Sequence, residues 1–176
     1  MQKRVNAIVE LPGKGILMGN GAGLWHIDKV TEKLERTGRE TINCGVQCFL
    51  LHNDTLYIGT ENGLYIRHGS TTEHILLHSS EFDPANFITG LYLKEGDLWL
   101  SSWRGLHVMT LQSRKIKSYD YNTGFSSIAG IGNTIYLGTS TMGLVEFEPA
   151  TGQFRRSVNV GCNIVSALSS DGEGLL

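Results

Sequence analysis

The sequence contains one short phrase four times, at nearly even intervals. Each copy joins an apolar triplet to a small or polar corner and then to a Gly-Leu step, and the copies start at Ile16, Leu56, Leu98 and Ile135. The glycines of the Gly-Leu steps stand at 23, 63, 105 and 143, so the intervals are 40, 42 and 38 residues. A period near 40 residues is typical of the four-stranded blade of a propeller.

Each period divides into four short β segments, and no window of 11 or more residues carries a clear helical periodicity, although 28–39 is polar enough to be ambiguous. Inner strands are expected at Val5–Leu11, Val46–Leu51, Phe87–Leu93, Ser126–Ile131 and Ile164–Leu168. More polar outer strands, whose charges protect an exposed edge, are expected at Lys33–Arg36, His74–His78, Lys115–Tyr119 and Gln153–Ser157.

The pattern predicts an all-β chain in which residues 1–176 form a single β-propeller segment of four-stranded antiparallel blades. The complete blades are expected at 5–43, 44–84, 85–123 and 124–161, and a partial fifth blade at 162–176. Because the fifth period has only an inner strand and the start of a second, we expect a segment of a larger propeller. A small propeller that closes on four blades, or one completed by oligomerisation, is the alternative.

Composition excludes several classes of protein. Glycine supplies 22 of 176 residues, against a usual share of about 7%, and predicts many tight turns. The longest apolar run, Cys48–Leu51, is far shorter than the roughly 20 residues of a spanning helix or the 7–15 of a signal-peptide core. A net charge of −2 gives no basic surface for nucleic acid or for an anionic membrane.

The repeated phrase resembles the two-component-regulator propeller repeat, which reads Asp-x-x-Gly-x-Leu-Trp-Ile-Gly-Thr-x-x-Gly-Leu. The best matches are residues 54–65, Asp-Thr-Leu-Tyr-Ile-Gly-Thr-Glu-Asn-Gly-Leu-Tyr, and residues 132–139, Gly-Asn-Thr-Ile-Tyr-Leu-Gly-Thr. The tryptophan of the pattern survives only as Trp99, and Gly-Thr is replaced at 19–20 and 101–102. The resemblance covers essentially the whole chain.

The resemblance implies a periplasmic ligand-sensing segment of a membrane-bound hybrid two-component histidine kinase that responds to a carbohydrate. The kinase and its phosphorelay would lie outside this chain, so no enzymatic activity and no cofactor are expected here. Expected partners are a small-molecule or oligosaccharide ligand, further propeller blades and, as an option, a second copy in a homodimer. The alternatives are a protein-interaction scaffold and, with less support, a polysaccharide lyase-type propeller enzyme.

Three motifs are read as structural. The run Gly19-x-Gly21-x-Gly23 precedes a strand rather than a helix, so it does not predict a phosphate site. His74 and His78 would lie about 13 Å apart on a strand, too far to share a metal, and all six histidines are expected to be solvated. The cysteine spacing fits neither a redox pair nor a zinc site and predicts buried free thiols.

The corners between second and third strands, together with the loops between blades, form the face on which propellers usually bind ligands. Trp103 is the outlier, because the other copies carry small or polar residues at this corner. An exposed Trp103 could stack on a sugar ring while Arg104 binds hydroxyls or a carboxylate; alternatively, Trp103 packs on a neighbouring blade or on a partner subunit. The candidate ligand-binding residues are Trp103, Arg104, Glu61, Asn62, Asn20, Thr141, Asp120 and Tyr121. Trp99, Tyr57 and Tyr136, in the second strands, are expected in the core.

Overall fold

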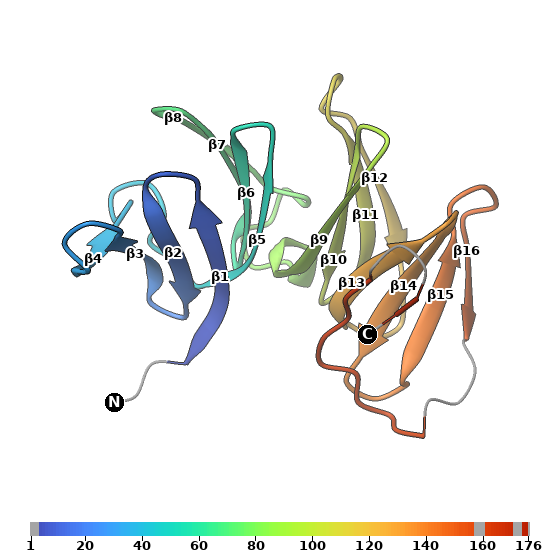
Figure 1. Ribbon diagram of the computed structural model, residues 1–176. Helices are drawn as coiled ribbons and strands as arrows, with labels where there is room; N and C mark the ends of the chain where they lie inside the picture. Colours follow the sequence, from blue (N-terminus) through green and yellow to red (C-terminus); the bar gives the residue numbers. More distant parts are fainter. Residues whose placement is uncertain (1–3, 157–160, 171–173, 176) are drawn as a thin grey trace. The chain divides into compact units, whose positions relative to one another are not determined.

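The computed structural model describes residues 4–156, 161–170 and 174–175, and these residues form four antiparallel sheets of four strands each (Figure 1). The first two sheets are β1 (Val5–Leu11), β2 (Gly15–Asn20), β3 (Gly23–Asp28) and β4 (Leu34–Thr37), then β5 (Val46–His52), β6 (Thr55–Thr60), β7 (Gly63–His68) and β8 (Thr71–Ile75). The other two are β9 (Ile88–Lys94), β10 (Asp97–Ser102), β11 (Gly105–Thr110) and β12 (Ile116–Asp120), then β13 (Phe125–Ile131), β14 (Thr134–Thr139), β15 (Leu144–Glu148) and β16 (Gln153–Arg156).

Within each sheet the strands follow one another in chain order, as in a propeller blade, so the predicted all-β propeller fold is confirmed. The described residues contain one helix, the single 3-10 turn η1 (Pro84–Asn86). None of the helical structure in the described part of the chain is long and apolar enough to cross a membrane.

Two predicted strands differ from the observed ones by more than one residue at an end. The outer strand of the second sheet is Thr71–Ile75 rather than 74–78, because Gly69 takes a φ of 57° and reverses the chain directly after β7. Residues 164–168, predicted as an inner strand, form no strand. The ambiguous stretch 28–39 contains a turn capped by the Asp28 carboxylate, followed by β4.

The chain divides into two compact units, Met1–Ile88 and Thr89–Leu176, and each unit has its own apolar core. The core of the first unit contains Leu17, Leu24, Ile42, Val46, Leu56, Ile58 and Tyr65. The core of the second contains Trp99, Leu106, Phe125, Ile128, Ile135, Leu137, Val145 and Phe147. Of the aromatic residues predicted for the core, Trp99 and Tyr57 are buried and Tyr136 is half-buried.

Glycines of the repeated phrase make room for the next repeat. A Cβ atom built on Gly19 would lie 2.4 Å from Cγ1 of Val46, at the start of the next inner strand. The same construction on Gly138 gives 2.9 Å to Cγ1 of Val165. Since real Cβ atoms do not approach so closely, a side chain at these positions would force neighbouring repeats apart.

A hydrogen bond between repeats accompanies this contact. Asn6 Nδ2 donates to the Val46 carbonyl at 3.0 Å, and Thr89 Oγ1 donates to the Phe125 carbonyl at 2.8 Å. Ser126 Oγ donates in the same way to the carbonyl of Val165. Val165 therefore accepts a bond equivalent to those accepted by Val46 and Phe125, the first residues of β5 and β13. The partial fifth blade stays a prediction.

Candidate functional site

The last residue of each second strand shapes the corner that follows it. Thr60 Oγ1 donates to the Gly63 carbonyl at 2.8 Å and accepts from the Asn62 backbone N–H at 3.0 Å. Thr139 Oγ1 donates to the Gly143 carbonyl at 2.9 Å and accepts from the backbone N–H of Met142 at 2.8 Å. These bonds satisfy polar groups of a tight turn, which explains why a threonine follows the glycine in the repeated phrase.

Asn20 occupies the same position in the first sheet. Its Oδ1 accepts from the Ala22 backbone N–H at 2.8 Å and from Trp25 Nε1 at 3.3 Å, and only 7% of the residue is exposed. Asn20, a predicted ligand contact, thus uses its side-chain oxygen within its own corner, and its contact with a ligand stays a prediction.

The outer strands of the first unit support these corners from the side. Arg36 Nη2 donates to the Ala22 carbonyl at 2.5 Å, and His74 Nε2 lies 2.6 Å from the Asn62 carbonyl. The His74 ring also stacks on Tyr65, with centroids 4.1 Å apart and planes 9° apart. His74 Nε2 must carry a proton to make its bond, so this histidine serves the corner.

Glu61 and Asn62 share the corner between β6 and β7. The exposed Glu61 carboxylate accepts from Gln47 Nε2 at 3.1 Å and lies against Gly45, where a Cβ would be 2.4 Å from the carboxylate. Asn62 Oδ1 is buried and has no hydrogen-bond partner among the described residues. Burial, followed by the nearby Cys44 and Glu81, raises the pKa of Tyr65 behind this corner to about 12.

Trp103 lies at the corner between β10 and β11 and is 55% exposed. A Cβ built on Gly124 would lie 2.9 Å from the Trp103 Cα and 3.0 Å from its carbonyl oxygen, so the loop after β12 passes directly against the Trp103 backbone. The backbone N–H of Tyr121 donates to the Arg104 carbonyl at 3.1 Å. The corner and the loop therefore support each other.

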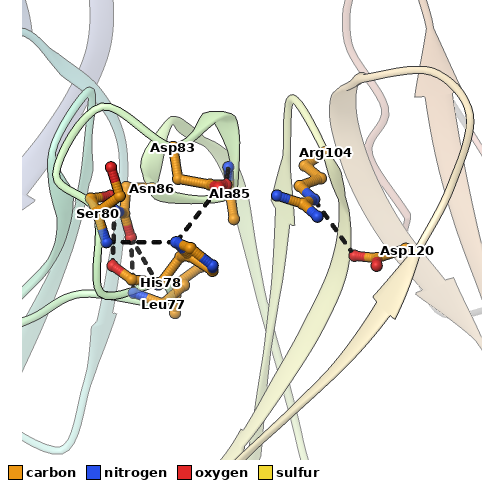
Figure 2. Close-up of polar contacts among 8 residues, drawn as sticks. All are labelled: Leu77, His78, Ser80, Asp83, Ala85, Asn86, Arg104 and Asp120. Atoms are coloured by element: carbon orange, nitrogen blue, oxygen red, sulfur yellow. Dashed lines mark hydrogen bonds and ion pairs between the residues drawn. The ribbon is translucent and has the colours of Figure 1, made fainter.

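Arg104 and Asp120 form an ion pair beside this tryptophan. Nε of Arg104 is 3.6 Å from Oδ1 of Asp120, and the two side chains are 45% and 71% exposed (Figure 2). Such exposed pairs contribute little to stability, about 0–1 kcal/mol, but they present a donor and an acceptor side by side.

The other two candidate ligand-binding residues of the second unit, Tyr121 and Thr141, have different surroundings. The Tyr121 ring packs between Phe125 and Phe154, with centroid distances of 5.3 and 4.6 Å. Thr141 is exposed, and its Oγ1 is 3.4 Å from that of Thr123. The structure thus brings Trp103, Arg104 and Asp120 together in the second unit, while Asn20, Glu61 and Asn62 belong to corners of the first unit.

The loop between β8 and β9, one of the loops between blades, is held by a buried asparagine that the sequence analysis did not identify. Asn86 is fully buried and uses its whole side-chain amide: Oδ1 accepts from the N–H groups of Leu77 and His78 at 2.7 and 3.0 Å. Its Nδ2 donates to the carbonyls of His78 and Ser80 at 3.0 and 2.7 Å (Figure 2). Phe82, between these anchors, is 95% exposed.

A sequence signal for this loop does exist. Asp83 precedes Pro84, and an aspartate before a proline is a typical start of a helical turn. Asp83 Oδ1 indeed accepts from the Ala85 N–H at 2.9 Å, and its Oδ2 lies 3.3 Å from His78 Nδ1.

His107 contradicts the expectation that every histidine is solvated. It is 1% exposed, with Nε2 2.9 Å from Ser102 Oγ and Nδ1 2.8 Å from Ser118 Oγ. The Ser102–His107 pair has the distance of a nucleophile and its base. However, Ser102 is fully buried and its Oγ also accepts from the Arg104 and Gly105 N–H groups, so the pair is structural.

The cysteines are free, as predicted, but they are not all buried. The prediction is wrong for Cys162, which is exposed. Cys48 is half-buried as a residue, yet its sulfur is enclosed, and burial raises the pKa of its thiol to about 12. Among the described residues, no group of three or more His, Cys, Asp or Glu side chains is arranged to hold a metal ion.

No protein-family model and no curated protein sequence matches this chain. Solved structures do match: the extracellular domain of BT4673 from B. thetaiotaomicron is 26% identical, with TM-scores of 0.73 and 0.74 in two structures. One of these structures is described as part of a one component system and the other as part of a hybrid two component system. The fold is that of a segment of this domain. The match covers 96% of this chain and 24% of the BT4673 extracellular-domain chain, so this chain spans about a quarter of the length of that domain.

A second similar structure is the extracellular domain of BT3049 from the same organism, also described as belonging to a hybrid two component system. It is 18% identical with a TM-score of 0.72, and the match covers 95% of this chain and 24% of that one. At this identity the likeness shows the fold alone.

Proposed function

We propose that this chain is a ligand-sensing segment of the extracytoplasmic part of a hybrid two-component sensor. The observation that carries the proposal is the match to the BT4673 extracellular domain over 96% of this chain at 26% identity. The repeated Gly-Thr-x-x-Gly-Leu phrase supports it independently, because the resemblance drawn from that phrase implies the same class of protein.

The segment acts by binding, and signal transfer takes place outside it. A ligand that binds one packing arrangement of the parent protein better than another shifts the population towards that arrangement and so biases a kinase across the membrane. The site consists of Trp103, Arg104 and Asp120, which are exposed and adjacent and do not form part of either apolar core. The ligand class is an oligosaccharide, since an exposed indole beside hydrogen-bonding groups suits a sugar ring.

Thermal shift measurements with a library of oligosaccharides test this function. We expect at least one saccharide to raise the melting temperature of the chain, because a ligand that binds only the folded state stabilises it by mass action. Calorimetric titration of each hit gives the affinity, and chromatography of the incubated ligand shows whether it stays intact. If no saccharide stabilises the folded chain, the sensor proposal fails; if the ligand is cleaved, the segment is an enzyme.

A protein-interaction scaffold is the second candidate, and Phe82 favours it. The ring is almost fully exposed on a loop that Asn86 holds in place, which is the arrangement of a preorganised contact residue. If the chain associates with itself through this residue, sedimentation velocity should show a concentration-dependent dimer that Phe82→Asp removes. A monomer at all concentrations contradicts self-association.

A further inference from the structure

We propose that Asn62, in the corner between β6 and β7, is a site of spontaneous deamidation and that the His74 side chain promotes the reaction. This modification does not depend on the proposed ligand-sensing function. Two asparagines in the sequence are followed by glycine, and these are Asn62 and Asn20. Since glycine has no Cβ atom, its backbone nitrogen approaches the side chain of the preceding asparagine with the least hindrance.

The reaction takes place within the Asn62–Gly63 step. The Gly63 backbone nitrogen loses its proton to water and attacks Cγ of Asn62, and the new N–C bond closes a succinimide ring. The bond from Cγ to Nδ2 breaks, and Nδ2 takes up a proton and leaves as ammonia. Water then opens the ring at either carbonyl and leaves aspartate or isoaspartate. One amide and one water thus give one carboxylic acid and one ammonia, and nothing is oxidised or reduced.

A hydrogen-bond donor already lies on the reacting peptide. His74 Nε2 is 2.6 Å from the Asn62 carbonyl oxygen, and the His74 ring stacks on Tyr65 with centroids 4.1 Å apart. When the Gly63 nitrogen loses its proton, the negative charge spreads to that oxygen, so a donor there stabilises the attacking anion. Gly63 lies opposite Thr60 in the last pair of the β6–β7 ladder, so the opening of one terminal pair frees its N–H.

The first sheet has an equivalent donor but no amide beside it. Ala22 and Asn62 hold the same place, because each directly precedes the glycine that begins the third strand of its sheet. Arg36 Nη2 donates to the Ala22 carbonyl at 2.5 Å, as His74 Nε2 does to the Asn62 carbonyl. Of these two corners, the second alone combines the donor with an asparagine side chain.

The asparagine of the first corner is held away from the reaction. Asn20 Oδ1 accepts from the Ala22 N–H and from Trp25 Nε1, so turning its amide towards the Gly21 nitrogen breaks two hydrogen bonds. Asn62 Oδ1 is buried without a hydrogen-bond partner in the part of the chain that the structure describes. The same rotation of Asn62 therefore breaks no bond at this atom.

The product changes a corner that contains candidate ligand-binding residues. Deamidation adds a negative charge next to Glu61. Isoaspartate also lengthens the backbone by one carbon between the Asn62 N–H and the Gly63 carbonyl, which both bond to Thr60 Oγ1. The modification therefore works against the two bonds that close the corner, and it is not reversed by refolding.

Peptide mapping by mass spectrometry of the full chain, incubated at pH 8, tests the proposal. We expect the folded chain to convert Asn62 at least about tenfold faster than Asn20, because only Asn20 has to break two hydrogen bonds. In guanidinium chloride, where both corners are lost, the two rates should lie within about threefold of each other. Hydroxylamine, which cleaves the chain at a succinimide, identifies the intermediate.

One substitution tests the donor. His74→Phe keeps a ring that can stack on Tyr65 and removes the N–H, so we expect the conversion of Asn62 to slow at least about threefold. Arg36→Met is the matched control, because it removes the corresponding donor from the first corner, and Asn62 should then react at the native rate. Circular dichroism checks that each variant is folded.

The outcomes separate the site from the role of the histidine. If the folded chain converts Asn20 as fast as Asn62, or leaves Asn62 intact while the unfolded chain reacts, the assigned site is wrong. If folded His74→Phe converts Asn62 at the native rate or faster, the role of His74 is wrong. Neither result alters the saccharide-binding test of the ligand-sensing function.

Discussion

At the scale of single residues, glycines decide how closely repeats approach one another. Gly19 lies against Val46, and Gly138 lies against Val165, in each case with no room for a methyl group. Gly21, only two residues from Gly19, has nothing within 4 Å of a built Cβ. The glycine excess of the sequence therefore has at least two separate causes, since one glycine is required by packing and the other is not.

We expect Gly19→Ala to lower the free energy of unfolding by about 1–3 kcal/mol, because the new methyl group overpacks the contact with Val46. Gly21→Ala is the control and should change it by less than about 1 kcal/mol. Urea denaturation followed by circular dichroism measures both. Equal effects of the two substitutions would contradict the packing explanation.

Two cysteines provide a second prediction at this scale. Burial raises the pKa of the Cys48 thiol to about 12, so at pH 8 this group is almost entirely protonated and a poor nucleophile. Cys162 is exposed and open to attack. Alkylation with iodoacetamide at pH 8, read by mass spectrometry, should therefore label Cys162 in the native chain and Cys48 only after unfolding. Rapid native labelling of Cys48 would show that its sulfur is accessible.

At the scale of elements, the loop from β8 to β9 depends on one amide side chain. Asn86 binds four backbone groups of Leu77, His78 and Ser80. A substitution at this position leaves several backbone groups of the loop without partners.

We expect Asn86→Ala to lower the free energy of unfolding by about 3 kcal/mol, because unpaired buried polar groups carry their full desolvation penalty. Asn122→Ala, in the exposed loop after β12, is the matched control and should stay within about 0.5 kcal/mol of the native chain. Hydrogen exchange of the Leu77 and His78 amides, which donate to Asn86, should accelerate only in the first variant. Unchanged exchange would mean that the loop is held in another way.

At the scale of the whole molecule, one hydrogen bond between repeats occurs at three places. Asn6 and Thr89 donate to the first residues of β5 and β13, and Ser126 donates to Val165, which lies outside the observed strands. The bond links elements that are roughly 40 residues apart in sequence, so it sets the register between repeats rather than within a sheet.

Removing the donor of this bond at Asn6, Thr89 or Ser126 should lower the free energy of unfolding of the chain. We expect Thr89→Val, which preserves the shape of the side chain, to lower the free energy of unfolding by about 1 kcal/mol. The substitution removes the hydroxyl that donates to the Phe125 carbonyl and that also lies within hydrogen-bond distance of the Ser101 carbonyl and Oγ. Thr71→Val on the exposed edge strand β8 is the control, with an expected change below about 0.5 kcal/mol. Thermal and urea unfolding give the free energy of unfolding of both variants. If Thr89→Val leaves it unchanged, this hydrogen bond makes no net contribution to stability.

The sequence alone determined the repeat and the four-stranded sheets, because strand alternation, glycine corners and apolar triplets are local properties of the chain. It also placed Trp103 and Arg104 on an exposed corner and Trp99 in the core. These positions follow from the strand register that the repeats share.

Only the tertiary structure decided the surroundings of individual polar and aromatic side chains. The Asn20 oxygen accepts two hydrogen bonds within its corner, the Tyr121 ring packs between phenylalanines, His107 is buried in β11, and Phe82 is exposed. The physical reason is that the surroundings of a side chain in a loop or at a corner depend on contacts with residues distant in sequence. Periodicity within a strand carries no information about such contacts.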